Sequence, residues 1–228
     1  SKNNDFQEFI DLLLNIAIKK KYTLEDFLST EFNNAGTVGN ALQNLISKIG
    51  ENIVIRRLEY LEFRNEKSKF GFYMHNKVKD NLGKIGCITM GSFEQDNENI
   101  SDILKKTAMH ISAAKPLAFD KDGLDQQLVS KEREIFLEQL ATSGKPKEIL
   151  EKIVNGKINK FISEITLLNQ NWILDPNKKV SEVISDFNKE NSCNFILEDY
   201  RLFVLGDGIE TASKDFKEEV ASQLTQKS

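Results

Sequence analysis

The amino-acid sequence predicts an α+β fold, with antiparallel sheets flanked by helices in two core subdomains and an inserted antiparallel coiled-coil helical hairpin. Three observations lead to this prediction. The apolar spacing is helical over the first 50 residues and changes to the pattern of strands at Ile53. It becomes helical again after Asp125. Between Leu150 and Leu168, apolar residues recur at steps of three and four, which is the spacing of a coiled-coil seam.

Helices are expected over residues 6–18, 23–32 and 38–49. In the first, apolar residues recur at helical spacing and three lysines follow, which suits the negative end of the helix dipole. The second begins with Thr23 three residues before Asp26, an arrangement similar to a capping box. Gly50 ends the third, because glycine readily adopts the left-handed conformation that closes a helix.

Strands are then expected over residues 53–61, 70–75 and 85–90, followed by a helix over residues 100–114. The second and third strands are joined by a polar stretch, residues 76–83, which predicts a long hairpin loop. His75 therefore ends a strand at the mouth of that loop, a position that often carries contacts. The helix ends before Pro116, because the residue before a proline avoids helical dihedrals.

Two helical arms are expected between residues 125 and 168. They are separated at Ser143-Gly144-Lys145-Pro146, where glycine can end one helix and proline can begin the next. The seam of the second arm consists of Leu150, Val154, Ile158, Phe161, Ile165 and Leu168. This hairpin should project from the core. A helix over residues 180–189, a strand over 195–205 and a terminal amphipathic helix with Phe216, Val220 and Leu224 complete the prediction.

The chain is accordingly divided into four expected parts. They are an incomplete, mostly helical N-terminal core subdomain (residues 1–56), a C-terminal core subdomain (57–124 and 169–208), the inserted coiled-coil hairpin (125–168) and a C-terminal helical module (209–228).

Composition excludes several classes of function. The formal net charge is −4, so no basic surface for gripping a phosphate backbone is expected, and direct nucleic-acid binding is disfavoured. No apolar run approaches the roughly 20 residues that span a bilayer, and the first residues lack the features of a signal peptide. Two cysteines alone cannot build a zinc site or a disulfide framework, and two histidines at this spacing exclude a His-rich metal site or an H-x-x-x-H pair. These features predict a cytoplasmic protein without a membrane partner.

No catalytic constellation is found, so the chain is not expected to be an enzyme. The close glycine pairs do not match a phosphate-binding loop. Cys87 lies inside an apolar strand, where a small buried thiol is the commoner role. His110 lies among apolar neighbours on a helix, which favours a core or boundary histidine over a ligand. An enzyme built around Cys87 or acidic residues is the weakest hypothesis.

The segment from Lys48 to Arg57, KIGENIVIRR, resembles the signature of the translation elongation factor Ts family. Further matches follow in the family's order over nearly the whole chain. They are Tyr73-x-His75, Ala108-Met109-His110, Ala113-Ala114-Lys115-Pro116, Ser143-Gly144-Lys145-Pro146, Glu148-Ile149, Val154-Asn155-Gly156-Lys157, Lys160-Phe161, Asp175-Pro176 and Gly206-Asp207-Gly208-Ile209-Glu210. Each match alone is weak, but so many in register are specific.

This resemblance implies a guanine-nucleotide exchange factor that binds the GTPase elongation factor Tu and promotes GDP release. It implies no catalytic residue, cofactor or metal. The residues that match the family's contacts to the partner are Ile49, Gly50, Asn52, His75, Ile173 and Leu174. From the residues alone, Ile49, Ile173 and Leu174 could equally be core.

Two departures from the family accompany the resemblance. Nothing here resembles the family's N-terminal ubiquitin-associated-like domain, and the T-D-F-V segment that wedges into the GTPase is absent. The chain is therefore expected to be a fragment that lacks its first hairpin. A coiled-coil dimerisation or scaffold module without exchange activity is the alternative, and a homodimer through the hairpin is left open.

Overall fold

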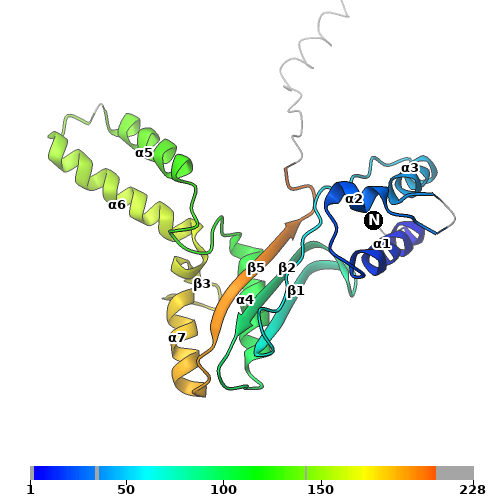
Figure 1. Ribbon diagram of the computed structural model, residues 1–228. Coiled ribbons are helices and arrows are strands. Elements are labelled where there is room, and N and C mark those ends of the chain that lie inside the picture. Colours follow the sequence, from blue (N-terminus) through cyan, green and yellow to red (C-terminus); the bar gives the residue numbers. More distant parts are fainter. Residues whose placement is uncertain (1–2, 34–35, 142, 209–228) are drawn as a thin grey trace, which may run out of the picture.

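The computed structural model describes residues 3–33, 36–141 and 143–208. The described residues form an α+β fold with an antiparallel sheet, as predicted (Figure 1). Its helices are α1 (Asn4–Ala17), α2 (Leu24–Ser29), α3 (Val38–Ile49), α4 (Ile100–Ala114), α5 (Gln126–Leu140), α6 (Lys147–Ile165) and α7 (Val180–Asn191), with a 3-10 turn η1 (Leu167–Asn169). Its strands are β1 (Ser68–Lys79), β2 (Leu82–Ser92), β3 (Asn171–Trp172), β4 (Asp175–Lys179) and β5 (Ile196–Val204).

Helices α1 to α3 build a small apolar core of their own. Their boundaries follow the caps expected from the sequence: the Thr23 side chain accepts a hydrogen bond from the backbone N–H of Asp26, and α3 ends at Gly50. The second helix is shorter than predicted, because it ends at Ser29. The buried residues of this core are Phe9, Leu13, Ala17, Phe27, Phe32, Val38, Ala41, Leu42 and Leu45.

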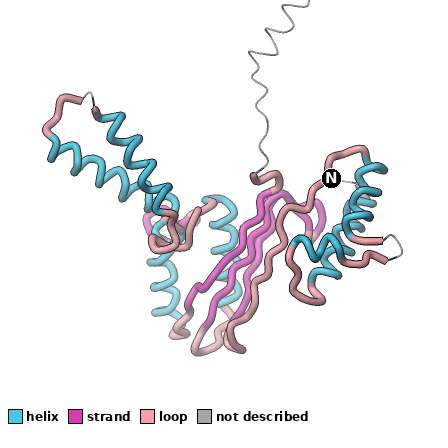
Figure 2. The backbone as a smooth tube through the Cα atoms, turned by 45° about the horizontal axis from the view of Figure 1, so that its top comes forward, coloured by secondary structure: helices cyan, strands magenta, loops and turns pink. Residues whose placement is uncertain are grey.

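The prediction of a strand over residues 53–61 is wrong. This segment belongs to no strand, and no backbone hydrogen bond pairs it with another described segment. An alternating pattern indicates an extended chain, but a strand also needs a partner backbone. Here Ile53, Ile55 and Leu58 pack instead against the core of α1 to α3. In Figure 2 the segment is a loop that links the N-terminal helices to the sheet.

The main sheet has the order β1-β2-β5 and is antiparallel throughout. Helix α4 covers one of its faces at close range. A Cβ atom on Gly71 would collide with the backbone at Leu104, and the hydroxyl of Thr89 donates a hydrogen bond of 2.9 Å to the Leu104 carbonyl. The second apolar core lies between sheet, α4 and α7, and includes Cys87, Ile100, Leu104, Ile111, Leu167, Trp172, Val180 and Phe195.

The prediction of a long hairpin loop over residues 76–83 is also wrong. Strand β1 continues to Lys79 and β2 begins at Leu82, so only two residues form the turn. The register shifts between Lys77 and Lys79, and Asn76 has a φ of 50°, which mark a β-bulge. His75 does not end the strand, because it pairs with Ile85. Polar residues suit a hairpin that extends beyond the core, where both faces meet solvent, so polarity did not distinguish strand from loop.

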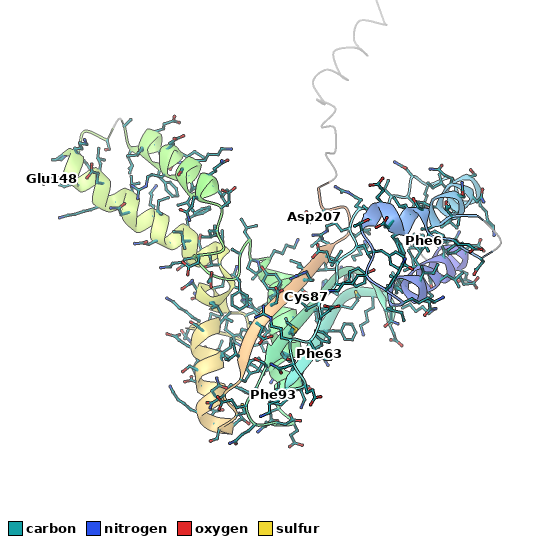
Figure 3. The ribbon with its side chains drawn as sticks, viewed as in Figure 1. Phe6, Phe63, Cys87, Phe93, Glu148 and Asp207 are labelled. Atoms are coloured by element: carbon teal, nitrogen blue, oxygen red, sulfur yellow. The ribbon has the colours of Figure 1, made fainter. Side chains whose placement is uncertain are left out.

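Helices α5 and α6 form the two expected arms and extend away from the sheet (Figure 1). The side chain of Arg133 donates a 2.6 Å hydrogen bond to Asn155, and Lys157 lies 4.8 Å from the ring centroid of Phe136. Glu148 lies near the outer end of the hairpin (Figure 3). Within the predicted seam, Val154 and Ile158 are buried, whereas Leu168 lies beyond α6 in the turn η1.

The later predictions of a helix and a strand are confirmed as α7 and β5. The predicted terminal helix, residues 209–228, lies outside the described residues.

Candidate partner-binding surface

The first group of predicted contact residues follows α3. Thr37 and Asn40 form a capping box at its start. Gly50 closes its end with a φ of 76°, and its N–H donates to the carbonyl of Ile46. Ile49 is half-buried and packs against the N-terminal core, whereas Gly50 and Asn52 are exposed. This loop therefore presents polar groups and backbone outward, and turns its apolar side chain partly inward.

His75 lies on β1, in a paired strand. Its side chain is exposed, and its Nδ1 atom lies 3.2 Å from the hydroxyl of Tyr73, with the two rings stacked. Beyond it, Lys79 forms an ion pair with Asp11 of α1, which connects the hairpin to the N-terminal helices. Rigid strand backbone on one side and a tyrosine hydroxyl on the other thus fix the direction of the His75 ring.

Ile173 and Leu174 lie at the tip of the turn between β3 and β4. Trp172 pairs with Asp175, so these two residues alone form the turn. Their side chains are 44% and 52% exposed. Large apolar side chains are unusual at a turn tip, where glycine, asparagine, aspartate and proline dominate. The sequence alone leaves open whether this pair belongs to the core, and the structure places both side chains at the surface.

His110 of α4 lies directly behind this turn. It is fully buried, and its Nδ1 atom accepts a 3.2 Å hydrogen bond from the backbone N–H of Ile173. Its Nε2 atom lies 3.0 Å from Oε1 of Gln170, and its ring stacks on Trp172 at 5.2 Å. Burial lowers the pKa of His110, and the Gln170 hydrogen bond opposes this in part. The expected core histidine is therefore confirmed, but its link to the turn was missed.

The other candidate reactive groups of the described residues show no sign of catalysis or metal binding. Cys87 is buried in the sheet (Figure 3), and burial raises its pKa to about 12, which fits the expected inert thiol. The histidine, cysteine, aspartate and glutamate side chains of the described residues form no group of three or more that could bind a metal ion. Likewise, no described helix is both long and apolar enough to cross a membrane.

The structure does not gather the predicted contact residues into one pocket. Helix α3 and the strands β3 and β4 lie on opposite sides of the main sheet, with β1 between them (Figure 1). The end of β5 is joined to the N-terminal segment by Arg57, whose guanidinium donates a 3.0 Å hydrogen bond to the Leu202 carbonyl and lies 4.4 Å from the Phe203 ring centroid. The three groups therefore lie at separated points of one fold.

Comparison with known proteins identifies the family. A family model described as Elongation factor TS matches residues 1–207. Elongation factor Ts of Rickettsia bellii (strain OSU 85-389) is 35% identical over 225 residues, covering 98% of this chain and 72% of that protein. Elongation factor Ts of Rickettsia massiliae (strain Mtu5) is 35% identical over 223 residues, covering 97% and 71%. This chain belongs to the elongation factor Ts family.

Membership of the elongation factor Ts family places the chain among the factors of translation, in protein biosynthesis. It confirms the resemblance carried by the motif beginning at Lys48. A third relative, Elongation factor Ts of Rickettsia felis (strain ATCC VR-1525 / URRWXCal2), is 34% identical and covers 97% of this chain and 71% of its own length. The family match over residues 1–207 thus includes all three groups of predicted contact residues.

Proposed function

We propose that this chain binds elongation factor Tu and promotes GDP release by stabilising the nucleotide-free state of that GTPase. The observation that carries the proposal is the pair of large apolar side chains, Ile173 and Leu174, exposed on a two-residue turn in a member of the elongation factor Ts family. Exposure of these side chains to water is unfavourable in the free chain. Their burial against a partner lowers the free energy and so favours binding.

The mechanism needs no bond-making group. A factor that binds the nucleotide-free GTPase more tightly than the GDP-bound form must, by linkage, weaken GDP binding by the same factor. Each tenfold weakening requires about 1.4 kcal/mol of differential contact free energy. A weakening of several powers of ten is more readily supplied by contacts at separated points than by one pocket. The separation of α3, β1 and β3 across the fold supports this arrangement.

The three groups are assigned different roles in this proposal. Ile173 and Leu174 supply apolar area at an anchor point. Gly50 and Asn52 offer exposed backbone and an amide, next to the half-buried Ile49. His75 offers an imidazole whose Nδ1 atom is occupied by Tyr73, which leaves Nε2 for a partner.

We further infer that α5 and α6 form an antiparallel coiled coil inserted between the two parts of the C-terminal core subdomain. Two observations support this: the helices contact each other, and Val154 and Ile158 of the seam are buried. The hairpin extends away from the sheet (Figure 3), so it is assigned no part in the three groups that contact elongation factor Tu.

Release of a fluorescent GDP analogue from elongation factor Tu tests the proposal. The analogue is preloaded, the chain is added with excess unlabelled GDP, and the decay rate is followed by stopped flow over a range of chain concentrations. We expect a rate that rises with concentration and saturates. A rate equal to spontaneous release at every concentration would overturn the exchange function, and co-elution without acceleration would favour a scaffold role.

A further inference from the structure

The turn that carries Ile173 and Leu174 is poorly supported by its own backbone. Strand β3 contains only two residues, and the register shifts between Asn171 and Trp172. Two-residue hairpin turns favour the types with positive φ at a central residue, because these match the strand twist. Neither Ile173 nor Leu174 has a positive φ. Something outside the hairpin must therefore hold the turn in shape.

His110 provides that support from α4. Its Nδ1 atom accepts the N–H of Ile173 at 3.2 Å, and its ring stacks on Trp172 with an interplanar angle of 21°. The imidazole thus holds the backbone at the first residue of the turn and the side chain of the residue before it.

Gln170 determines which imidazole nitrogen carries the proton. Its Nε2 atom donates a 2.8 Å hydrogen bond to the carbonyl of Glu164, which directs Oε1 toward His110. An amide oxygen only accepts hydrogen bonds, so Nε2 of His110 must be the protonated nitrogen. Nδ1 is then free to accept from Ile173. The network is complete only with a neutral imidazole in this tautomer.

We propose that His110 is a positioning residue that holds the Ile173–Leu174 turn in the shape that binds elongation factor Tu, and that protonation of His110 releases the turn and weakens binding. This inference rests on the proposed function. Protonation of the neutral imidazole would add a proton at Nδ1. The Nδ1–H and the Ile173 N–H would then be two hydrogen-bond donors facing each other, with their nitrogens 3.2 Å apart.

Burial and the Gln170 hydrogen bond set the pKa of His110, and no charged side chain of the described residues contributes. In the same core, Cys87 of β2 and Tyr200 of β5 are neutral at pH 7, because burial raises the pKa of each to about 12. On β4, Asp175 accepts the backbone N–H of Asn177 at 3.2 Å.

Three ion pairs near His110 hold charged side chains of the neighbouring helices. Lys178 pairs with Asp186 of α7 at 2.7 Å, Lys160 with Glu164 of α6 at 3.7 Å, and Lys106 with Asp102 of α4 at 2.6 Å.

The sign of the pH effect follows from these contacts. Burial lowers the pKa of His110 in the folded chain, below its value of about 6.5 in an unfolded chain. The neutral form is therefore the one that folding stabilises. This stabilisation is fully present above about pH 6.5, and it is lost as the pH falls toward the folded pKa.

The test compares His110→Asn with His110→Gln. Asparagine places its amide near Nδ1, so it can still accept from Ile173 but cannot titrate. Glutamine reaches toward Nε2, so it keeps a group for Gln170 and loses the acceptor for Ile173. Circular dichroism establishes that each variant is folded. Affinity for nucleotide-free elongation factor Tu is measured over a pH series that runs down from pH 7.5 to the lowest pH at which both proteins stay folded. The wild-type to variant ratio at each pH cancels any titration of the partner.

We expect His110→Gln to bind about tenfold more weakly than wild type at pH 7.5, which is the scale of one lost hydrogen bond. Its disadvantage should shrink as the pH falls through the pKa of His110, because the wild-type turn is then released as well. His110→Asn should bind within about threefold of wild type at pH 7.5 and more tightly than wild type once His110 is protonated. Wild-type to variant ratios that stay constant across the whole pH series, for both variants, would overturn the proposal.

A measurement on the unmodified chain avoids the risk that a variant does not fold. Hydrogen exchange by NMR gives the protection factor of the Ile173 amide across the same pH range. We expect protection at pH 7.5 that falls as His110 is protonated, and constant protection would overturn the positioning role. Protection that falls as expected, in a chain that does not bind elongation factor Tu at any pH, would overturn the proposed function and leave the hydrogen-bond link established.

Discussion

The loop after α3 and the turn between β3 and β4 expose their apolar residues in opposite ways. Ile49 is the last residue of a capped helix and packs partly into the N-terminal core. Ile173 and Leu174 lie at a turn tip, with about half of each side chain exposed. The first segment contributes to its own fold, whereas the second is held from behind by His110 and contributes little packing itself.

This difference predicts how substitutions behave. A change at Ile49 must alter folding stability and binding together, because the same side chain serves both. A change at Ile173 can alter binding while the core stays intact, because its side chain is not part of the apolar core cluster and its hydrogen bond to His110 is made by the backbone N–H. Separating affinity from stability therefore distinguishes the two segments.

The largest effect is expected for Ile173→Asp. A carboxylate at the covered centre of an interface must be desolvated without a partner, which costs several kcal/mol. We expect affinity for elongation factor Tu to fall by about 100-fold, which corresponds to roughly 2.7 kcal/mol. The midpoint of thermal unfolding should stay within about 2 °C of wild type, as is usual for surface substitutions. Isothermal titration calorimetry and thermal denaturation measure the two quantities.

Ile196→Asp is the matched control for this change. Ile196 is also exposed, at 61%, but it lies at the start of β5 and outside the three groups of contact residues. Its affinity should equal that of the wild type. Loss of the folded state in Ile173→Asp would show that Ile173 belongs to the core, and equal losses of affinity in both variants would show that the effect is general charge repulsion.

The next effect is expected for Ile49→Ala. Fully buried isoleucines lose 2–5 kcal/mol on truncation, so a half-buried one should lose about 1.5 kcal/mol of unfolding free energy. Affinity should fall by about tenfold, because the loop at Gly50 loses the packing that fixes it. Urea denaturation and calorimetry provide the two values.

Ile46→Ala serves as its control, since Ile46 lies one turn earlier on α3 and packs against the same core. It should lose similar stability and retain affinity. If both variants lose affinity equally, the loop after α3 responds only to the stability of the helix, and Ile49 is not itself a contact.

The helices of this fold were predictable because their signals are local. The capping residue Thr23 and the closing Gly50 act within a few residues, and the structure confirms both. The absence of a strand at 53–61 was not predictable, because pairing depends on a partner backbone that a local pattern does not reveal. The prediction of where β1 ends failed for a related reason. Beyond the core, strand formation does not depend on burial, and the segment after His75 that was predicted as a loop is paired strand.

The candidate site was predictable only in part. The resemblance identified Ile173 and Leu174, and a local signal was also present, namely two large apolar residues directly before Asp175-Pro176, a turn-forming pair. The hydrogen bond between His110 and Ile173 could not be predicted from the sequence. The two residues are separated by 63 positions, and the donor is a backbone N–H that has no sequence signature.

A smaller effect is expected for Gly50→Ala. Gly50 has a φ of 76°, and a Cβ atom there would meet nothing within 4 Å, so the cost is backbone strain alone. We expect a loss of about 1 kcal/mol of unfolding free energy. Gly144→Ala is matched, because Gly144 has a φ of 67° with the same open surroundings in the distant hairpin. Only the change at Gly50 should weaken binding, by about threefold, and equal affinities would remove Gly50 from the contact surface.

The smallest effect is expected for His75→Ala. The side chain is exposed and bonded only to the hydroxyl of Tyr73 among the described residues, so its removal should leave the unfolding free energy within about 0.5 kcal/mol of wild type. Affinity for elongation factor Tu should fall by about fivefold, the scale of one hydrogen bond at an interface. Tyr73→Phe is the informative control, because it keeps the imidazole and frees its direction. An intermediate loss in Tyr73→Phe would show that the ring must be held in place, whereas wild-type affinity in His75→Ala would limit the contact surface to the loop after α3 and the turn at Ile173.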